Sequence, residues 1–182
     1  EPKYALDDAR AWVVATPDPS ALAWASLGQQ QQNSNFTGAA ADAYAKALQK
    51  DPNQLTIRAQ RSKLLLEMRR EGQASEDACV VLEAHPDDRA AALALEVAEA
   101  LCDKYEAALR DDEVTRMVQR AGKYAERSPK MLAHRARLAA MDGDIVAAKR
   151  DLKRAKQLKP DLPEYTRVER LLKPQRTSWW RW

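Results

Sequence analysis

The sequence predicts an all-α protein in which antiparallel helix pairs stack side by side into an α-solenoid. Alanine, leucine, arginine, lysine and glutamate recur along the 182 residues, and there are only five glycines. Most of these recurring residues are strong helix formers. Pro52 and Pro86 lie 34 residues apart at points where a helix is expected to stop. No apolar run approaches the roughly 18 residues that would indicate a membrane-spanning helix.

The N-terminal elements are predicted as three helices, over residues 4–15, 21–32 and 37–50. The first is amphipathic and ends before Pro17, and Ser20 is expected to cap the second through its hydroxyl group. Asp51-Pro52 ends the third, because the residue before a proline disfavours helical backbone. The inward face of the first helix is expected to carry Leu6, Ala9, Trp12 and Val13.

The remaining elements follow the same pattern less regularly. Helices are expected near 54–69 and 75–84, with a break at Glu71-Gly72 between them. Longer helices over 88–108 and 111–127 are expected to fill the interval from Pro86 to Pro129, which is nine residues longer than the spacing of the preceding prolines. A further helix pair over 129–160 and a short final helix over 164–173 complete the chain.

The spacing of large and small residues over 21–54 resembles a tetratricopeptide (TPR) repeat, a helix-turn-helix unit of about 34 residues. Large residues occupy the packing positions of the first helix, and small residues occupy the positions where the two helices touch. A proline stands where the second helix ends. The residues that carry this resemblance are Trp24, Leu27, Gly28, Ala40, Tyr44, Ala47 and Pro52. The chain is thus similar to TPR proteins, and to bacterial ones in particular.

The resemblance implies a single TPR-like domain over residues 1–173, with three to four repeats and a capping helix. The repeats fall at about 21–54, 55–88, 89–128 and 129–162, and the capping helix at 164–173. Residues 174–182 form a tail rich in tryptophan and arginine.

The first helices of TPR repeats line a concave groove that holds a peptide or a helix of a partner protein. Carried over by position, this resemblance implies a groove lined by three sets of residues. They are Leu22, Ala25, Gln29, Gln32 and Asn33 in the first unit, Thr56, Ala59, Lys63, Leu66 and Glu67 in the second, and Lys130, Ala133, Arg137 and Met141 in the last.

Charge is distributed unevenly along the chain. Residues 1–118 contain 13 Lys and Arg against 20 Asp and Glu, whereas residues 119–182 contain 17 against 7. This asymmetry permits a contact between the C-terminal part and an anionic surface, although a solvated outer helix face is the alternative. A second contact is therefore expected at Lys149, Arg150, Lys153, Arg154, Trp179, Trp180 and Trp182.

No catalytic, metal or cofactor site is expected from the sequence. There is no phosphate-binding loop or nucleophile elbow. His85 and His134 lack a cysteine or histidine at metal-ligand spacing, and Cys79 and Cys102 are expected to be unpaired, buried residues.

These patterns favour a non-enzymatic scaffold or assembly factor within a larger complex. It would bind a partner segment in the groove and make a second contact, to a membrane surface or another subunit, through its basic, tryptophan-ended C-terminus. One alternative is a periplasmic accessory protein for cytochrome c or secreted-protein maturation, because the Trp-x-x-Leu-Gly unit also resembles bacterial TPR proteins with that role. Another is an anionic-lipid or nucleic-acid binder acting through the basic C-terminal third, with nucleic acid the less favoured ligand. The sequence does not fix the compartment, and a periplasmic or membrane-associated location is favoured over the cytoplasm.

Overall fold

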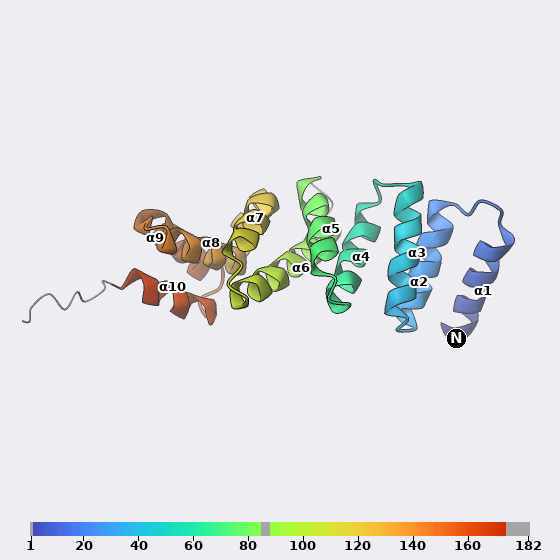
Figure 1. Ribbon diagram of the computed structural model, residues 1–182, viewed down its shortest axis with the longest axis horizontal. Coiled ribbons are helices and arrows are strands. Elements are labelled where there is room, and N and C mark those ends of the chain that lie inside the picture. The colour runs from blue at the N-terminus through green and yellow to red at the C-terminus, as the bar shows by residue number, and fades with distance from the viewer. Residues whose placement is uncertain (1, 85–87, 174–182) are drawn as a thin grey trace, which may run out of the picture. The chain divides into compact units, whose positions relative to one another are not determined.

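The structure is a computed structural model that describes residues 2–84 and 88–173 (Figure 1). Every regular element in these two ranges is a helix and none is a strand, which confirms the all-α prediction. No described helix is both long enough and apolar enough to cross a membrane. The elements are α1 (Pro2–Ala15), α2 (Ala21–Asn33), α3 (Thr37–Lys50), α4 (Leu55–Glu67), α5 (Glu71–Glu83), α6 (Asp88–Ala107), α7 (Asp111–Ala121), a 3-10 helix η1 (Gly122–Arg127), α8 (Pro129–Met141), α9 (Ile145–Leu158) and α10 (Glu164–Leu172).

The chain divides into two compact units, Glu1–Leu101 and Cys102–Trp182, here called the N-terminal unit and the C-terminal unit. In the N-terminal unit α2 pairs with α3 and α4 pairs with α5, while α1 packs on α2 and α3 packs on α4 (Figure 1). In the C-terminal unit α8 pairs with α9, and both α7 and α10 pack on α8. Both units are therefore built from helical hairpins. The single domain over 1–173 stays a prediction.

The first hairpin has the boundaries that its capping residues predict. The Ser20 hydroxyl accepts a hydrogen bond from the Ala23 N–H at 3.2 Å and so caps α2. Helix α3 covers residues 37–50 as expected and ends at Asp51, directly before Pro52. Local signals in the sequence were sufficient here because each end carries its own cap or breaker.

The hairpin turns share one backbone device that the sequence did not reveal. In each turn, one residue has left-handed backbone. The N–H of the residue that follows it donates a hydrogen bond of 2.8 Å to the carbonyl of the residue five positions before the donor. The expected break at Glu71-Gly72 is wrong, because the turn lies at Arg69 and α5 already begins at Glu71. The carboxylate of Glu71 suits a helix N-terminus. The left-handed residues are Asn35 (φ 61°), Arg69 (φ 58°), Leu109 (φ 56°) and Gly143 (φ 83°).

The turn at Leu109 also fixes the register of the long helix α6. Helices α2, α4 and α8 have 13 residues each and α6 has 20. All four helices end at the same distance before their left-handed turn residue. The extra length of α6 therefore lies at its N-terminal end. Helix α7 is shorter than the expected helix over 111–127, because Gly122 (φ 51°) ends it and η1 follows.

Pro129 is the first residue of α8 and is not a helix stop like Pro52, which follows the end of α3. The Ser128 hydroxyl accepts a hydrogen bond from the Met131 N–H at 3.0 Å and caps this helix. The spacing from Pro86 to Pro129 is therefore not a repeat length, because Pro129 begins a helix and does not follow one.

The α4–α5 and α8–α9 hairpins are each held by an ion pair between the seventh residues of their two helices. Arg61 contacts Asp77 through Nε at 2.6 Å and Nη2 at 2.7 Å. Arg135 contacts Asp151 through Nε at 2.6 Å and Nη2 at 3.1 Å. Both aspartate side chains are only 3% exposed. At the same positions, α2 and α3 have the apolar residues Leu27 and Ala43, which pack together with α1.

The outer helix α1 packs on α2 and α3 through Leu6, Ala9 and Val13, as predicted. Trp12, which was expected on the same inward face, is 50% exposed instead. It lies next in sequence to the buried Val13, so it points to a different side of the helix.

Replacing Gly28 by alanine is expected to destabilise the N-terminal unit. A Cβ atom there would lie 2.5 Å from Cδ1 of Tyr44, whose side chain is fully buried and cannot move aside. Overpacking of this kind costs about 1–3 kcal/mol, which outweighs the better helix propensity of alanine. Urea denaturation followed by circular dichroism should show the loss. The control is Gly72→Ala, where a Cβ meets no atom within 4 Å and stability should rise. Equal stability of the two variants would contradict this packing.

Candidate protein-binding surface

In the N-terminal unit, the predicted groove residues divide into accessible and buried ones. Ala25 and Ala59 are buried, with 6% and 0% of their surface exposed, so they serve the packing between helices. The others are half-buried or exposed and can meet a partner. These are Leu22, Gln29, Gln32 and Asn33 on α2, and Thr56, Lys63, Leu66 and Glu67 on α4.

Four amide side chains on α2 and α4 form a group that we call the amide row: Gln29, Gln32, Asn33 and Gln60. Gln60 Nε2 donates to Gln29 Oε1 at 3.1 Å, which links the two helices. Gln29 Nε2 in turn donates to Asn33 Oδ1 at 3.1 Å. Sequence reasoning predicted the three residues on α2 and missed Gln60, although a second glutamine on the next first helix was a visible signal.

Tyr44 supports the amide row from α3. Its hydroxyl donates to Gln32 Oε1 at 2.9 Å. Burial raises the pKa of Tyr44 to about 12, so the hydroxyl remains a neutral donor. A primary amide offers two N–H donors and a carbonyl acceptor, and the amide row uses only some of them internally. The row can therefore hydrogen-bond both the N–H and the C=O groups of a peptide.

A charged pair lies beyond the amide row in the same unit. Lys63 Nζ is 3.1 Å from Glu96 Oε1, and the two side chains are 40% and 63% exposed. An exposed pair of this kind contributes little to stability, and its members can exchange partners when a ligand binds.

In the C-terminal unit, the predicted groove residues Lys130 and Arg137 are already paired with carboxylates. Lys130 Nζ is 2.9 Å from Asp103 Oδ2, and Arg137 forms ion pairs with Glu106 and Asp111. Of the other two predicted residues, Ala133 is 1% exposed and therefore buried, and Met141 is 51% exposed.

His134 connects these carboxylates, a role that no local pattern in the sequence indicated. Its Nδ1 lies 2.7 Å from Glu106 Oε2 and its Nε2 lies 3.1 Å from Asp103 Oδ1, with only 2% of the residue exposed. A carboxylate only accepts hydrogen bonds, so both ring nitrogens carry a proton and the ring is an imidazolium. Burial alone would lower the pKa of His134, but its hydrogen bonds to Asp103 and Glu106 raise it above its ordinary value.

Glu106 is the centre of this ion network. Burial alone would raise its pKa, but hydrogen bonds from His134 and Arg167 and the charge of Arg137 lower the pKa to about 2. Arg167 Nη1 donates to Glu106 Oε1 at 2.6 Å, which ties α10 to the residues from α6 and α8. The network holds three helices together, with its main acids ionised and its histidine protonated.

The described residues contain no cluster that could hold a metal ion. Asp103 and Glu106 lie on opposite nitrogens of the His134 ring, so the three side chains do not converge on one point. Cys79 and Cys102 are both buried and are not joined by a disulfide, as expected from the sequence.

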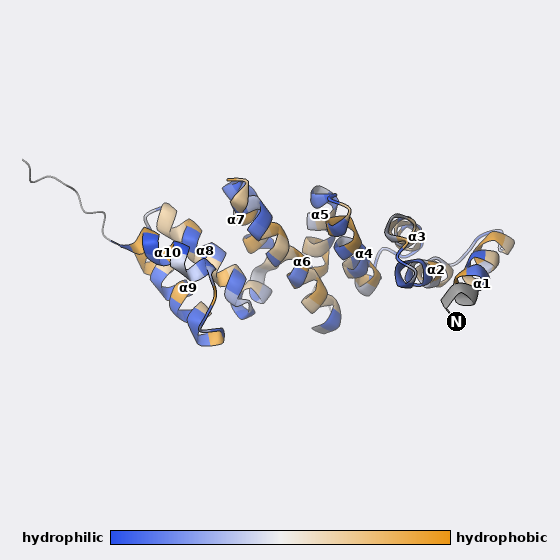
Figure 2. Cartoon of the chain, turned by 90° about the horizontal axis from the view of Figure 1, so that it is seen from below, coloured by the Kyte–Doolittle hydropathy of each residue, from blue (hydrophilic) through white to orange (hydrophobic). Residues whose placement is uncertain are grey.

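The basic residues of the predicted second contact lie on the exposed face of α9, a mostly hydrophilic helix (Figure 2). Lys149, Arg150, Lys153 and Arg154 are exposed, and Arg150 also contacts Asp151 at 3.1 Å. Lys149 and Lys153 border a shallow depression over Leu152. The predicted contacts Trp179, Trp180 and Trp182 lie outside the described residues.

The chain matches no protein-family model and no curated protein sequence.

Proposed function

We propose that this chain is a non-enzymatic protein-binding scaffold of the TPR type, which holds a partner segment along α2 and α4 of its N-terminal unit. Support for the TPR type comes from hairpins whose first helices α2 and α4 begin 34 residues apart, at residues 21 and 55, and from a turn device common to all the hairpins. Stacked hairpins offer extended surfaces on which many small contacts add up to recognition.

The observation that carries the proposal is the amide row. It places partly accessible amides from two successive first helices within hydrogen-bonding distance of one another. Such amides recognise the peptide backbone as well as side chains, so an extended segment or a helix end is the ligand they suit.

The exposed basic face of α9 supports a second contact in the same scaffold. Lys149, Arg150, Lys153 and Arg154 on this face are accessible and would attract an acidic partner surface. The same observation favours a second candidate function, the binding of an anionic lipid surface through the C-terminal unit, for which affinity would fall steeply with added salt.

Selection of random peptides displayed on phage against the full chain tests the groove. Peptides that bind are expected to lose affinity roughly thirtyfold for the double variant Gln29→Ala and Gln60→Ala, because two hydrogen bonds contribute about 1 kcal/mol each. Isothermal titration calorimetry measures the change. Gln49→Ala, which removes an exposed amide from α3, is the matched control and should leave affinity unchanged. Failure to enrich any peptide, or equal affinities for the double variant and the control, would contradict the proposal.

A further inference from the structure

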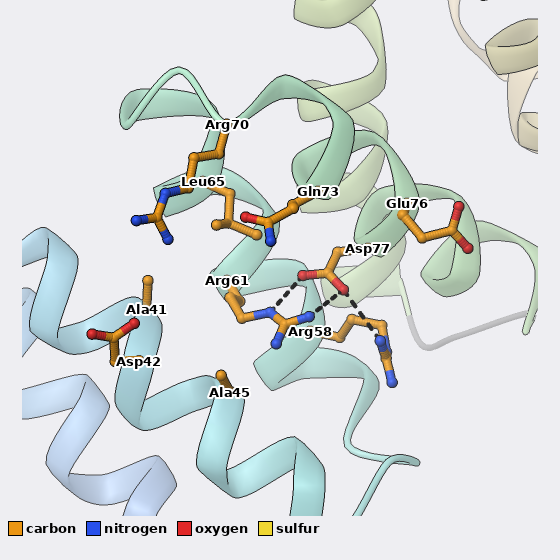
Figure 3. Close-up of a pocket in the computed structure, with 10 residues that line it drawn as sticks. All are labelled: Ala41, Asp42, Ala45, Arg58, Arg61, Leu65, Arg70, Gln73, Glu76 and Asp77. Atoms are coloured by element: carbon orange, nitrogen blue, oxygen red, sulfur yellow. Dashed lines mark hydrogen bonds and ion pairs between the residues drawn. The ribbon is translucent and has the colours of Figure 1, made fainter.

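A recess in the N-terminal unit lies between α3 and the α4–α5 hairpin (Figure 3). Its volume is about 340 Å³. Small residues on α3, Ala41 and Ala45, form one wall and leave room in front of the opposite helices. None of the residues of the amide row lines it, so it is a separate site.

Three guanidinium groups line this recess, and its one buried carboxylate does not satisfy them all. Asp77 binds Arg61 through both oxygens and also contacts Arg58 Nη1 at 3.2 Å. Arg58 Nε is buried and has no hydrogen-bond partner in the described part of the chain. Two arginines thus share a single aspartate.

Arg70 adds a third positive charge at the start of α5. Its guanidinium points toward α3 in Figure 3, and no ion pair involves it within the described ranges. The α5 N-terminus beside it has no side-chain cap, and the N-terminal end of a helix favours negative charge. Together these groups favour a carboxylate, which accepts hydrogen bonds from guanidinium groups in a bidentate manner.

The rim of the recess carries the opposite charge. Asp42 on α3 and Glu76 on α5 are exposed at its edge. A ligand that presents only negative charge would be repelled by them, whereas a basic group next to the carboxylate would pair with Asp42. We propose that this recess binds an acidic side chain of a partner peptide, flanked in that peptide by a basic residue.

The C-terminal unit provides an internal comparison. It has an equivalent recess of about 270 Å³ between α7 and α8, lined by the corresponding arginine, Arg135. The residue directly before α9 there is Asp144, where the first recess has Arg70 before α5. Asp144 thus places a negative charge where Arg70 places a positive one. The second recess is therefore expected to reject the same peptide.

Nuclear magnetic resonance of the arginine Nε–Hε groups in the full chain tests the proposal. The probe is the peptide acetyl-Gly-Gly-Glu-Lys-Gly-Gly-amide, with the glutamine analogue as the control probe. Addition of the glutamate peptide should shift the Arg61 and Arg70 signals and leave the Arg135 signal in place. Arg70→Gln should weaken binding roughly tenfold or more. Arg69→Asn, which removes a neighbouring charge outside the recess, should not.

Three results would overturn the assignment. They are equal shifts with the glutamate and glutamine peptides, no shift with either, and tighter binding of free succinate than of the peptide. Because no residue of the amide row lines the recess, these results leave the phage-selection test of the proposed function unaffected.

Discussion

Replacing His134 by alanine is expected to lower the free energy of unfolding of the C-terminal unit by about 3–5 kcal/mol, the usual cost of removing one partner from a buried charge network. The variant leaves Glu106, 9% exposed, and Asp103 facing an empty space without their shared cation. Hydrogen exchange of the α8 amides in the wild type and the variant measures the loss. His134→Gln keeps a polar side chain without the positive charge, so it should recover only part of the stability.

The same network should give the C-terminal unit a stability maximum in mildly acidic solution. The pKa of His134 is raised on folding, so its contribution is complete below its unfolded value of about 6.5 and is lost as pH rises through the folded value. The pKa values of Asp103 and Glu106 are lowered, so their contributions are lost as pH falls below about 4. The other cations that face these carboxylates are Lys130 and Arg137 on α8 and Arg167 on α10. Lysine and arginine side chains ordinarily titrate well above this pH range.

Stability measured as a function of pH should therefore fall above about pH 6.5 in the wild type and lose this fall in His134→Ala. Titration of the His134 ring by nuclear magnetic resonance supplies the folded pKa directly. An ordinary pKa for that ring, or the same dependence of stability on pH in both proteins, would contradict the imidazolium assignment.

Replacing Asp77 by alanine is expected to cost the N-terminal unit about 3 kcal/mol, because Arg58 and Arg61 then lose their shared carboxylate. Urea denaturation measures the change, and Asp42→Ala, an exposed carboxylate on α3, is the matched control. The double variant Arg61→Leu and Asp77→Ala should recover part of the loss. It reproduces the apolar pair Leu27 and Ala43 at the same positions of the first hairpin.

A stability of Asp77→Ala within about 0.5 kcal/mol of the wild type, which is typical of a surface substitution, would show that the pair is not part of the packing. The parallel variant Asp151→Ala tests the equivalent pair in the C-terminal unit and should behave in the same way.

The helices could be predicted where the chain carries a local signal. Ser20 marks the start of α2, and Pro52 marks the end of α3. The turns at Arg69 and Leu109 could not be predicted, because neither residue type is common in left-handed backbone. The start of α5 depends on the first of these turns and was therefore predicted wrongly. The register of α6 depends on the second and was therefore left open.

The buried charges were hidden from sequence reasoning for a different reason. His134 stands beside Arg135 and near Arg137, a context typical of a solvated basic face. Its partners on α6 are 28 and 31 residues away, and only the packing of α8 on that helix brings them together. Asp77 is likewise buried only because an arginine from the facing helix neutralises it. Local periodicity reports which residues are apolar, but it does not report which charges are paired.

The amide row lies between these two cases. Gln29, Gln32 and Asn33 were predicted as binding residues by position in the repeat, and they are accessible on α2. Gln60 was missed because its role depends on a hydrogen bond to the neighbouring hairpin.

Hydrogen exchange of the full chain, with and without a peptide from the phage selection, tests most directly whether a partner segment lies along α2 and α4. The peptide is expected to slow exchange of amides in α2 and α4, and this protection should be lost in the Gln29→Ala and Gln60→Ala variant. Protection confined to α9 or to the recess beside α3, or no protection anywhere, would contradict binding along α2 and α4.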